Sequence, residues 1–402
     1  MRAKLNDICE LIVDCPHSTE PDEGKGYPII RTPNIGVGYL DLEGVQRVSR
    51  AAYDRRNVRA VPRPGDLIMA REAPAGNVGI IREGMEVCLG QRTVLIRPDA
   101  RSVCPLFLNY YLNAPRQRHN LLRNSNGATV AHVNMPIIRN LLVDLPDLET
   151  QRRIAGVLSA YDEFIENNRK QIKLLEEAAQ RLYKEWFVDL KFPGHETTPI
   201  VDGLPEGWHT GSLLDLADVV RGCSYSSDEI VNGEKTLINL GNLTPFGGFR
   251  FGYAKPYSGK SRDDQKVAKG DVIMGLTEQA TGLAGFAALL PAIPNDSVIS
   301  ADLLKLVPHA GVSAVFVYAV LRFGQLSELI SPLANGTKVK HLRPESIPRA
   351  TVLLPSKRLA NDYAELVTPL YDQISICDQR ICAAREARDR LLPKLMSGEI
   401  EV

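Results

Sequence analysis

The chain repeats itself, and this repetition constrains its fold more than any other feature of the sequence. Five short motifs of the first half return in the same order in the second half, each 205 to 209 residues later. Such self-similarity is typical of chains built from copies of one structural unit, and it predicts an internal duplication of about 200 residues. The matching pairs are Leu5–Cys15 with Leu213–Cys223, Ile30–Asn34 with Ile238–Asn242, Gly65–Met69 with Gly270–Met274, Asn126–His132 with Asn335–His341, and Leu145–Pro146 with Leu354–Pro355.

Each copy begins with a globular part in which short apolar runs alternate with Gly, Pro and Asn. Short apolar runs bounded by turn residues are typical of β-strands. In the first copy we expect strands at residues 29–30, 66–69, 94–96 and 141–143, and a short helix at 105–112. The predicted fold class is therefore α+β, with two mixed α/β domains. Two domains also fit the length of 402 residues, because single cores stop growing near ~250–300 residues.

A different period follows Pro146, where apolar residues are spaced alternately by four and three positions. This heptad spacing marks one face of a long helix, with Asn168 as its polar exception. The pattern recurs 209 residues later, so we expect two equivalent helices, each of about 40 residues and roughly 60 Å. The predicted seam residues are Ile154, Leu158, Tyr161, Ile165, Ile172, Leu175 and Leu182 in the first helix, and Val367, Leu370, Ile374, Ile381 and Leu391 in the second.

Two apolar seams in one chain can be buried in two ways. They can pack on each other as an antiparallel coiled coil, or each can lie on the core of its own globular part. The strict spacing and the length favour the coiled coil. Asn168 either sets the register of that pair or is tolerated beside a small neighbour, and we prefer the second interpretation.

The sequence lacks the common motifs of enzyme active sites. It contains no phosphate loop, no Gly-x-Gly-x-x-Gly dinucleotide loop, no His-Glu-x-x-His and no Gly-x-Ser-x-Gly. The Asp/Asn-Pro-Pro-aromatic tetrapeptide of amino-methyltransferases is absent too, because the chain has no Pro-Pro. Cys15 and Cys223 occupy equivalent positions in apolar stretches, so we interpret both as small buried hydrophobes. We therefore expect no catalytic residues, no metal site and no cofactor bound by this chain.

Cysteine usage and hydropathy indicate the compartment. Seven cysteines without a Cys-x-x-Cys pair argue against a disulfide framework or structural zinc, and they favour a reducing cytoplasm. No apolar run approaches the roughly 20 residues of a membrane span. The first ten residues also lack the apolar core of a secretory signal. We thus expect a cytoplasmic protein.

Polar residues gather at the turns between the predicted strands of both globular parts. Arg, Asn, Gln, Lys and Thr are the side chains that read base edges in the major groove of DNA. Polar loop residues are more often simply solvated, and Asn-Gly is a hairpin signal in its own right. We nevertheless predict DNA contacts from these clusters. The candidate residues are Arg31, Asn34, Arg71, Gln91, Arg92, Asn126, Thr129 and His132 in the first copy, and Asn239, Asn242, Thr277, Glu278, Thr337, Lys338, Lys340 and His341 in the second.

A net charge of zero argues against tight DNA binding by the chain alone, since proteins that hold DNA alone are usually basic. The charge is unevenly distributed, however. Residues 1–145 carry 19 Lys and Arg against 15 Asp and Glu, whereas residues 147–190 carry 7 against 9. The total therefore averages a mildly basic globular part with an acidic helix, although a charge run can also be a merely solvated face.

Several motifs together resemble the specificity (S) subunit of type I restriction–modification systems. The segment Leu145–Leu158 is similar to the P-L-x-x-Q-x-x-I start of the central conserved helix of that family, which continues here to Arg181–Phe187. Arg390–Ile400 resembles the family's ending, and Gly65–Met69 its strand signature. Pro355–Asn361 departs from the pattern, because the start of the second helix lacks the Glu-Gln pair.

The resemblance implies a division of labour along the whole chain. Residues 1–146 and 193–355 would be two target recognition domains, each reading half of a split, asymmetric site in double-stranded DNA. Residues 147–192 and 356–402 would be the conserved helices that set the spacer and dock two methyltransferase (M) subunits. Restriction (R) subunits would join through the assembled complex, and S-adenosylmethionine and ATP would bind the partners. Two alternatives are a catalytic DNA methyltransferase, which the missing motifs disfavour, and a coiled-coil scaffold that joins proteins without nucleic acid.

Overall fold

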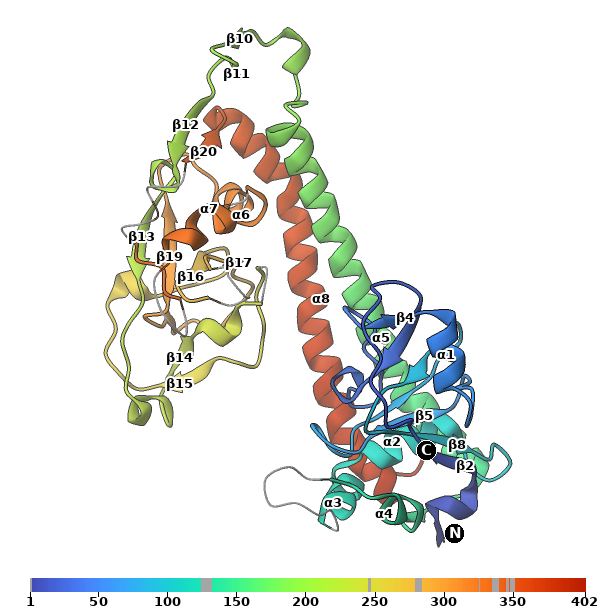
Figure 1. Cartoon of the computed structure of the whole chain (residues 1–402). Coiled ribbons are helices and arrows are strands. Elements are labelled where there is room, and N and C mark those ends of the chain that lie inside the picture. The colour runs from blue at the N-terminus through green and yellow to red at the C-terminus, as the bar shows by residue number, and fades with distance from the viewer. Residues whose placement is uncertain are drawn as a thin grey trace. The chain divides into compact units, whose positions relative to one another are not determined.

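A computed structural model describes residues 2–123, 132–244, 247–278, 284–324, 326–334, 340–344, 347 and 351–402. The chain divides into two compact units. Unit 1 comprises Met1–Ile165 with Ala383–Val402, and unit 2 comprises Glu166–Cys382. Two long helices, α5 (Leu148–Tyr183) and α8 (Lys357–Ser397), each pass through both units (Figure 1). We call the rest of unit 1 before α5 head 1, and the part of unit 2 between the two long helices head 2.

Head 1 is built on a four-stranded antiparallel sheet in the order β2-β8-β5-β6. A three-stranded sheet in the order β4-β3-β7 and the pair β1-β9 complete its strands. The strands are β1 (Arg2–Lys4), β2 (Cys9–Asp14), β3 (Tyr27–Ile30), β4 (Arg47–Val48), β5 (Leu67–Ala70), β6 (Val78–Ile80), β7 (Cys88–Leu89), β8 (Thr93–Pro98) and β9 (Leu142–Asp144). The helices are α1 (Arg50–Arg56), α2 (Pro105–Asn113), α3 (Pro115–Arg123) and α4 (Met135–Arg139).

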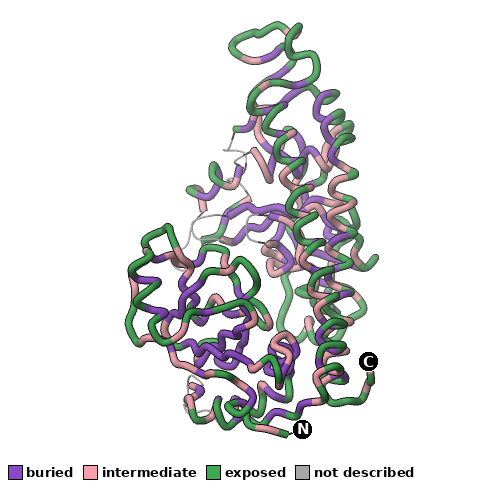
Figure 2. The backbone as a smooth tube through the Cα atoms, turned by 90° about the vertical axis from the view of Figure 1, so that its right-hand side faces the viewer, coloured by how far each residue is buried: buried purple, intermediate pink, exposed green. Residues whose placement is uncertain are grey.

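Strand β5 shows why this sheet is buried on both faces. Successive side chains of a strand point to opposite faces. Leu67 and Met69 join one core with helix α2, while Ile68 and Ala70 join a second core on the other face. All four residues are fully buried. Figure 2 shows such buried stretches in the interior of the heads and exposed residues along the long helices. The expected strands in this half overlap β3, β5, β8 and β9, and the expected helix overlaps α2, so the α+β prediction is confirmed.

Head 2 has the same strand orders. Its four-stranded sheet runs β13-β19-β16-β17, its three-stranded sheet β15-β14-β18, and its two-stranded sheet β12-β20. The small hairpin β10-β11 comes before them along the chain. The strands are β10 (Ile200–Val201), β11 (Leu204–Pro205), β12 (His209–Ser212), β13 (Ala217–Arg221), β14 (Lys235–Ile238), β15 (Lys255–Tyr257), β16 (Val272–Gly275), β17 (Ala287–Leu289), β18 (Ser297–Ile299), β19 (Leu303–Pro308) and β20 (Thr351–Leu354), and the helices are α6 (Ala314–Phe323) and α7 (Leu326–Ile330).

The long helices contact each other within each unit, and they run antiparallel there. In unit 1, Ile154 packs in one cluster with Leu395, and Arg388 Nη1 lies 2.5 Å from Asp162 Oδ1. In unit 2, Cys377 Sγ donates to Gln171 Oε1 at 3.4 Å. Tyr363 Oη donates to the carbonyl oxygen of Ala179 at 3.1 Å. Each predicted seam residue is buried or half-buried, as is Asn168.

The two units differ in the side chains at the base of each head. In unit 2, α5 ends in a turn of π-helix at Lys184–Val188, whose aromatic residues pack with Tyr363 and Phe316. In unit 1, Ile154 and Leu158 of α5 pack with Leu395 of α8 instead. In the described ranges, no single helix is long and apolar enough to cross a bilayer. Only α6 together with residues 326–333, bent by 64°, passes a test of length and composition.

Candidate nucleic-acid interface

Arg71 lies at the centre of a buried polar cluster in head 1. It follows strand β5, and only 10% of its side chain is exposed. Nη1 donates to Asp14 Oδ2 at 2.8 Å, and Nε donates to the carbonyl oxygen of Val133 at 3.0 Å. Its Nη2 lies 2.9 Å from His132 Nε2. A guanidinium that is buried must be paired in this way, because an uncompensated buried charge is costly.

The base-reading role of Arg71 stays a prediction, and in this structure its side chain is bound within the protein. All three of its hydrogen-bonding nitrogens are engaged inside the protein, and its backbone pairs with Val133, whose N–H donates to the Arg71 carbonyl at 2.9 Å. Arg71 therefore holds His132 and Val133 beside the end of strand β5. The sequence could not show this, because Asp14 and Val133 are far from Arg71 along the chain.

Glu72 connects two of the predicted residues of head 1, Arg92 and His132. Its Oε2 lies 3.2 Å from His132 Nδ1, and its Oε1 forms an ion pair with Arg92. Arg92 adopts a left-handed backbone conformation with φ of 63°, and 64% of its side chain is exposed. A non-glycine residue with positive φ is uncommon and suggests a functional constraint. We call Glu72, Arg92 and His132 the head 1 polar centre.

Head 2 has the same backbone hydrogen bonds at the corresponding place, but different side chains. The N–H of Arg71 donates to the Arg92 carbonyl in head 1, and the N–H of Leu276 donates to the Asp302 carbonyl in head 2. Thr277 Oγ1 lies 3.2 Å from His341 Nδ1, just as Glu72 contacts His132. We call Thr277, Asp302 and His341 the head 2 polar centre.

The correspondence shows what sequence reasoning missed. Asp302 immediately precedes strand β19, as Arg92 immediately precedes β8. No repeated motif surrounds either residue, so only the strand pairing shows that they correspond. Leu276 takes the place of Arg71 and needs no charge partner, which explains why head 2 lacks the buried Arg–Asp pair.

The predicted asparagines serve the turns in which they lie. Asn34 Oδ1 accepts the N–H of Arg31 at 3.1 Å, and Asn242 Oδ1 accepts the N–H of Asn239 at 3.0 Å. Asn242 is fully buried, and its Nδ2 donates to the Arg250 carbonyl. Short polar side chains commonly satisfy turn backbones in this way. The base-reading roles of these residues stay predictions, and of the four residues only Arg31 is exposed.

The remaining candidates differ in exposure and in their contacts. Gln91 Nε2 donates to the His17 carbonyl, and Thr277 is buried beside His341. Lys340 and His341 are exposed. Glu278 pairs with Lys340 through the backbone, since its N–H donates to the Lys340 carbonyl at 2.9 Å. Asn126, Thr129, Thr337 and Lys338 lie outside the described residues.

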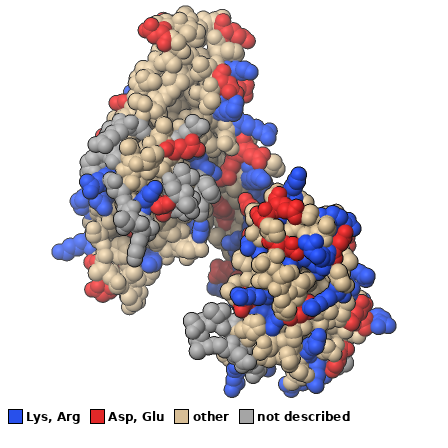
Figure 3. Space-filling model, viewed as in Figure 1, with Lys and Arg blue, Asp and Glu red and all other residues tan. Residues whose placement is uncertain are grey.

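Basic side chains also line the surface of head 1, interspersed with acidic ones (Figure 3). Part of the arginine run at residues 47–63 is structural, because Arg56 is buried and donates to the carbonyl oxygen of Leu89 at 2.6 Å. Arg116 and Arg123 of α3 line a groove of about 720 Å³ together with Arg2. Clustered arginines attract phosphates, so this groove suits the backbone of a nucleic acid.

Within the described residues, no group of three or more His, Cys, Asp or Glu could hold a metal ion. Burial raises the pKa of the Cys15 thiol, which disfavours the nucleophilic thiolate. The Cys223 thiol is buried and donates to the carbonyl oxygen of Ile299 at 3.3 Å. Both cysteines fit the small buried hydrophobes expected from the sequence.

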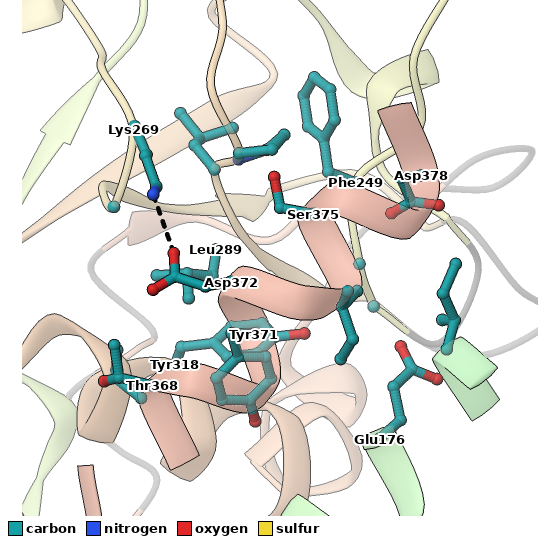
Figure 4. Close-up of a pocket in the computed structure, with 18 of the residues that line it drawn as sticks. Glu176, Phe249, Lys269, Leu289, Tyr318, Thr368, Tyr371, Asp372, Ser375 and Asp378 are labelled. Atoms are coloured by element: carbon teal, nitrogen blue, oxygen red, sulfur yellow. Dashed lines mark ion pairs between the residues drawn. The ribbon is translucent and has the colours of Figure 1, made fainter. Parts of the chain in front are cut away.

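A cavity of about 420 Å³ lies in unit 2, where head 2 meets α5 and α8 (Figure 4). Lys269 of head 2 forms an ion pair with Asp372 of α8, with Nζ 2.8 Å from Oδ1. Glu176 of α5 also lines the cavity, and burial raises the pKa of its carboxyl. The rest of the lining is mainly apolar, so the cavity is part of the contact between head 2 and the helices.

Comparisons with known proteins agree with the motifs. Residues 1–177 match the family model of the type I restriction modification DNA specificity domain. The type I restriction enzyme MjaIX specificity subunit of Methanocaldococcus jannaschii is 26% identical over 99% of this chain and 93% of that protein. The HindI specificity subunit of Haemophilus influenzae is 22% identical over 76% of this chain and 80% of that protein.

Among solved structures, the S subunit of a type I restriction-modification system from M. genitalium matches with a TM-score of 0.60 at 14% identity. The match covers 98% of this chain and 95% of that one, and it shows a shared fold. The relatives are named as specificity subunits over nearly the full length of the chain. The resemblance inferred from the motifs is thus confirmed. Residues 1–177 thus match the type I restriction modification DNA specificity domain, and the chain is similar to named type I specificity subunits over nearly its full length.

Proposed function

We propose that this chain is the non-catalytic subunit that reads a bipartite, asymmetric DNA site for a type I restriction–modification complex. The observation that carries the proposal is that two heads share three sheet orders but present different polar centres. This pattern supports an internal duplication in which the scaffold was kept and the reading residues diverged. Each head would then contact one half of the site, and the halves would differ in sequence.

The long helices would act as an antiparallel coiled coil that separates the heads. Buried seam positions and the antiparallel contacts within each unit support this role. Several apolar side chains on the helices are exposed, including Leu174 at 65% and Leu366 at 56%. Exposed apolar residues of this kind suit partner docking. The helices would dock two methyltransferase subunits, and restriction subunits would join through the assembled complex.

The partners would supply the chemistry, with S-adenosylmethionine and ATP bound to them. The base to be methylated would be an adenine that a methyltransferase subunit flips out of the duplex, because the target atom is inaccessible inside it. Joining two heads in one chain makes the second DNA contact effectively intramolecular, which multiplies affinity without new contacts. With a net charge of zero, the chain alone would bind DNA weakly.

Sequencing of methylated DNA tests the proposal. Cells carrying this chain with its methyltransferase subunits should show methylated adenines in a site of two different specific parts and a fixed unspecified gap. A continuous site, or no methylation dependent on this chain, would contradict it. If the assembled complex also showed no salt-dependent DNA binding, the protein-scaffold alternative would be favoured.

A paired deletion tests the spacer role of the helices. Gln171 lies opposite Cys377, so deleting residues 168–174 together with 374–380 removes one heptad from each helix and keeps the register. The helices shorten by about 10 Å, which should shorten the gap by roughly 3 base pairs. Deleting residues 168–174 alone is the matched control, and it should abolish assembly because the two seams no longer align. An unchanged gap in the paired deletion would contradict the spacer role.

A further inference from the structure

The two polar centres carry opposite charges at corresponding positions, and we propose that this difference sets the base preference of each head. Arg92 of head 1 would read a guanine through its acceptor edge. Asp302 of head 2 would read the exocyclic amino group of a cytosine or an adenine. The inference rests on the proposed function and deepens it, since it names the chemistry that each half-site must present.

The geometry of Arg92 suits a base contact. Its left-handed turn directs a side chain that is 64% exposed, while Glu72 holds one end of the guanidinium. Glu72 is itself fixed by His132. Nε and Nη2 of Arg92 make no hydrogen bond to any residue that the structure describes. Two parallel donors on a held guanidinium match O6 and N7 of guanine, the commonest specific contact in the major groove.

Asp302 offers the opposite chemistry from the corresponding place. It is half-exposed, and within the described part of the chain its carboxylate has no hydrogen bond or ion pair. An ionised carboxylate only accepts hydrogen bonds, so on a base edge it fits the amino group at N4 of cytosine or N6 of adenine. The carboxylate is also repelled by DNA phosphates. Asp302 therefore cannot bind the phosphate backbone of DNA, whereas Arg92 could bind either a phosphate or a base.

The two polar centres also share a feature, a histidine in contact with a polar oxygen. His132 and His341 occupy corresponding positions, and each Nδ1 lies 3.2 Å from a polar oxygen of its centre. The histidine is shared and does not distinguish the two heads, whereas its oxygen partner is a carboxylate in Glu72 and a hydroxyl in Thr277. At the position just before the next strand, Arg92 and Asp302 differ in the sign of their charge.

The test uses the full chain assembled with its methyltransferase subunits. Methylated sites are sequenced for Arg92→Ala and Asp302→Ala, and binding is measured on the wild-type site and on duplexes changed at one base pair each. Two exposed, ion-paired residues serve as controls. Arg101→Ala removes an arginine of head 1 that is 89% exposed and paired with Asp99, and Asp264→Ala removes a carboxylate of head 2 that is paired with Arg262.

Each variant should lose discrimination at one position of one half-site, with binding to the wild-type site weakened about tenfold to a hundredfold. Arg92→Ala should relax a G·C position, and Asp302→Ala should relax a position in the other half. Arg92→Lys keeps the charge but loses the fork, so it should retain the salt dependence of binding and still lose the preference. The control variants should leave both halves unchanged.

Three results would overturn the inference. One is equal weakening of all sequences by Arg92→Ala, which would indicate a phosphate contact. The others are unchanged preferences in both variants, and relaxation of both half-sites by a single variant. Failure of the proposed function would be recognised by a different result, namely that the wild-type complex methylates no bipartite site.

Discussion

The two heads meet the long helices through corresponding residues of different chemistry. In unit 1, Tyr110 of α2 donates to Asp162 of α5 at 2.5 Å, and Arg388 of α8 binds the same carboxylate. In unit 2, Tyr318 of α6 packs edge-on against Tyr371 of α8, with ring centroids 5.3 Å apart. We call these contacts joint 1 and joint 2. Asp162 and Tyr371 are 209 residues apart, the distance between the two heptad patterns.

The two heads therefore contact the long helices at corresponding positions, but through side chains of different chemistry. Joint 1 depends on charged hydrogen bonds, and burial with the Asp162 contact raises the pKa of Tyr110. Joint 2 depends on apolar and aromatic area, together with the ion pair of Lys269 and Asp372. The polar centres follow the same rule, since their backbone bonds agree and their charges do not.

The largest effect is expected from the aromatic cluster of unit 2. Tyr363 is fully buried among Phe187, Trp186 and Phe316, so Tyr363→Ala should lower the free energy of unfolding by about 3–5 kcal/mol. Denaturant unfolding measures this loss. Tyr225→Ala, at a tyrosine that is 37% exposed, should cost far less. If both variants lost the same free energy of unfolding, the burial of Tyr363 would not explain the stability of this cluster.

Joint 1 should respond to the loss of its carboxylate. Asp162→Ala leaves Arg388 and Tyr110 without their shared partner, which should cost about 1–3 kcal/mol in denaturant unfolding. Asp389→Ala removes a second, 62% exposed carboxylate from the same arginine and is expected to cost less than about 1 kcal/mol. If Asp389→Ala were the more damaging change, the polar description of joint 1 would be wrong.

A smaller effect is expected where Glu72 holds Arg92. Glu72→Gln removes the charge that orients the guanidinium, so binding of the wild-type DNA site should weaken by about 1 kcal/mol. Combined with Arg92→Ala, it should add little, because Glu72 acts on DNA through Arg92. Additive losses in this double-mutant cycle would show that Glu72 acts independently.

The smallest effect is a pH dependence confined to joint 2. Burial raises the pKa of Glu176, so the folded chain binds this proton more tightly than the unfolded chain. Stability from this group should therefore fall as pH rises from the usual glutamate pKa through the folded value. Glu176→Gln should raise stability at pH 8 by up to about 1 kcal/mol and leave it unchanged near pH 4. Glu177→Gln, at a neighbour paired with Arg181, is the control and should show no such trend.

Periodicity made the helices and much of head 1 predictable from the sequence. The heptad seam requires only local spacing, and the strands of head 1 require only apolar runs between turns. The candidate site was harder to predict from the sequence, because its contacts join segments that are far apart along the chain. Arg71 was predicted at the surface, but Asp14 and Val133 hold it inside. Asp302 was not predicted, because no shared motif surrounds it. Only the backbone hydrogen bonds between strands show that it corresponds to Arg92.

The central claim is that the two heads read two different half-sites independently. Exchanging residues 1–146 for the equivalent domain of another family member, and sequencing the methylated DNA, tests it most directly. The account predicts that one half-site changes while the other half and the gap stay the same. A change in both halves would contradict it.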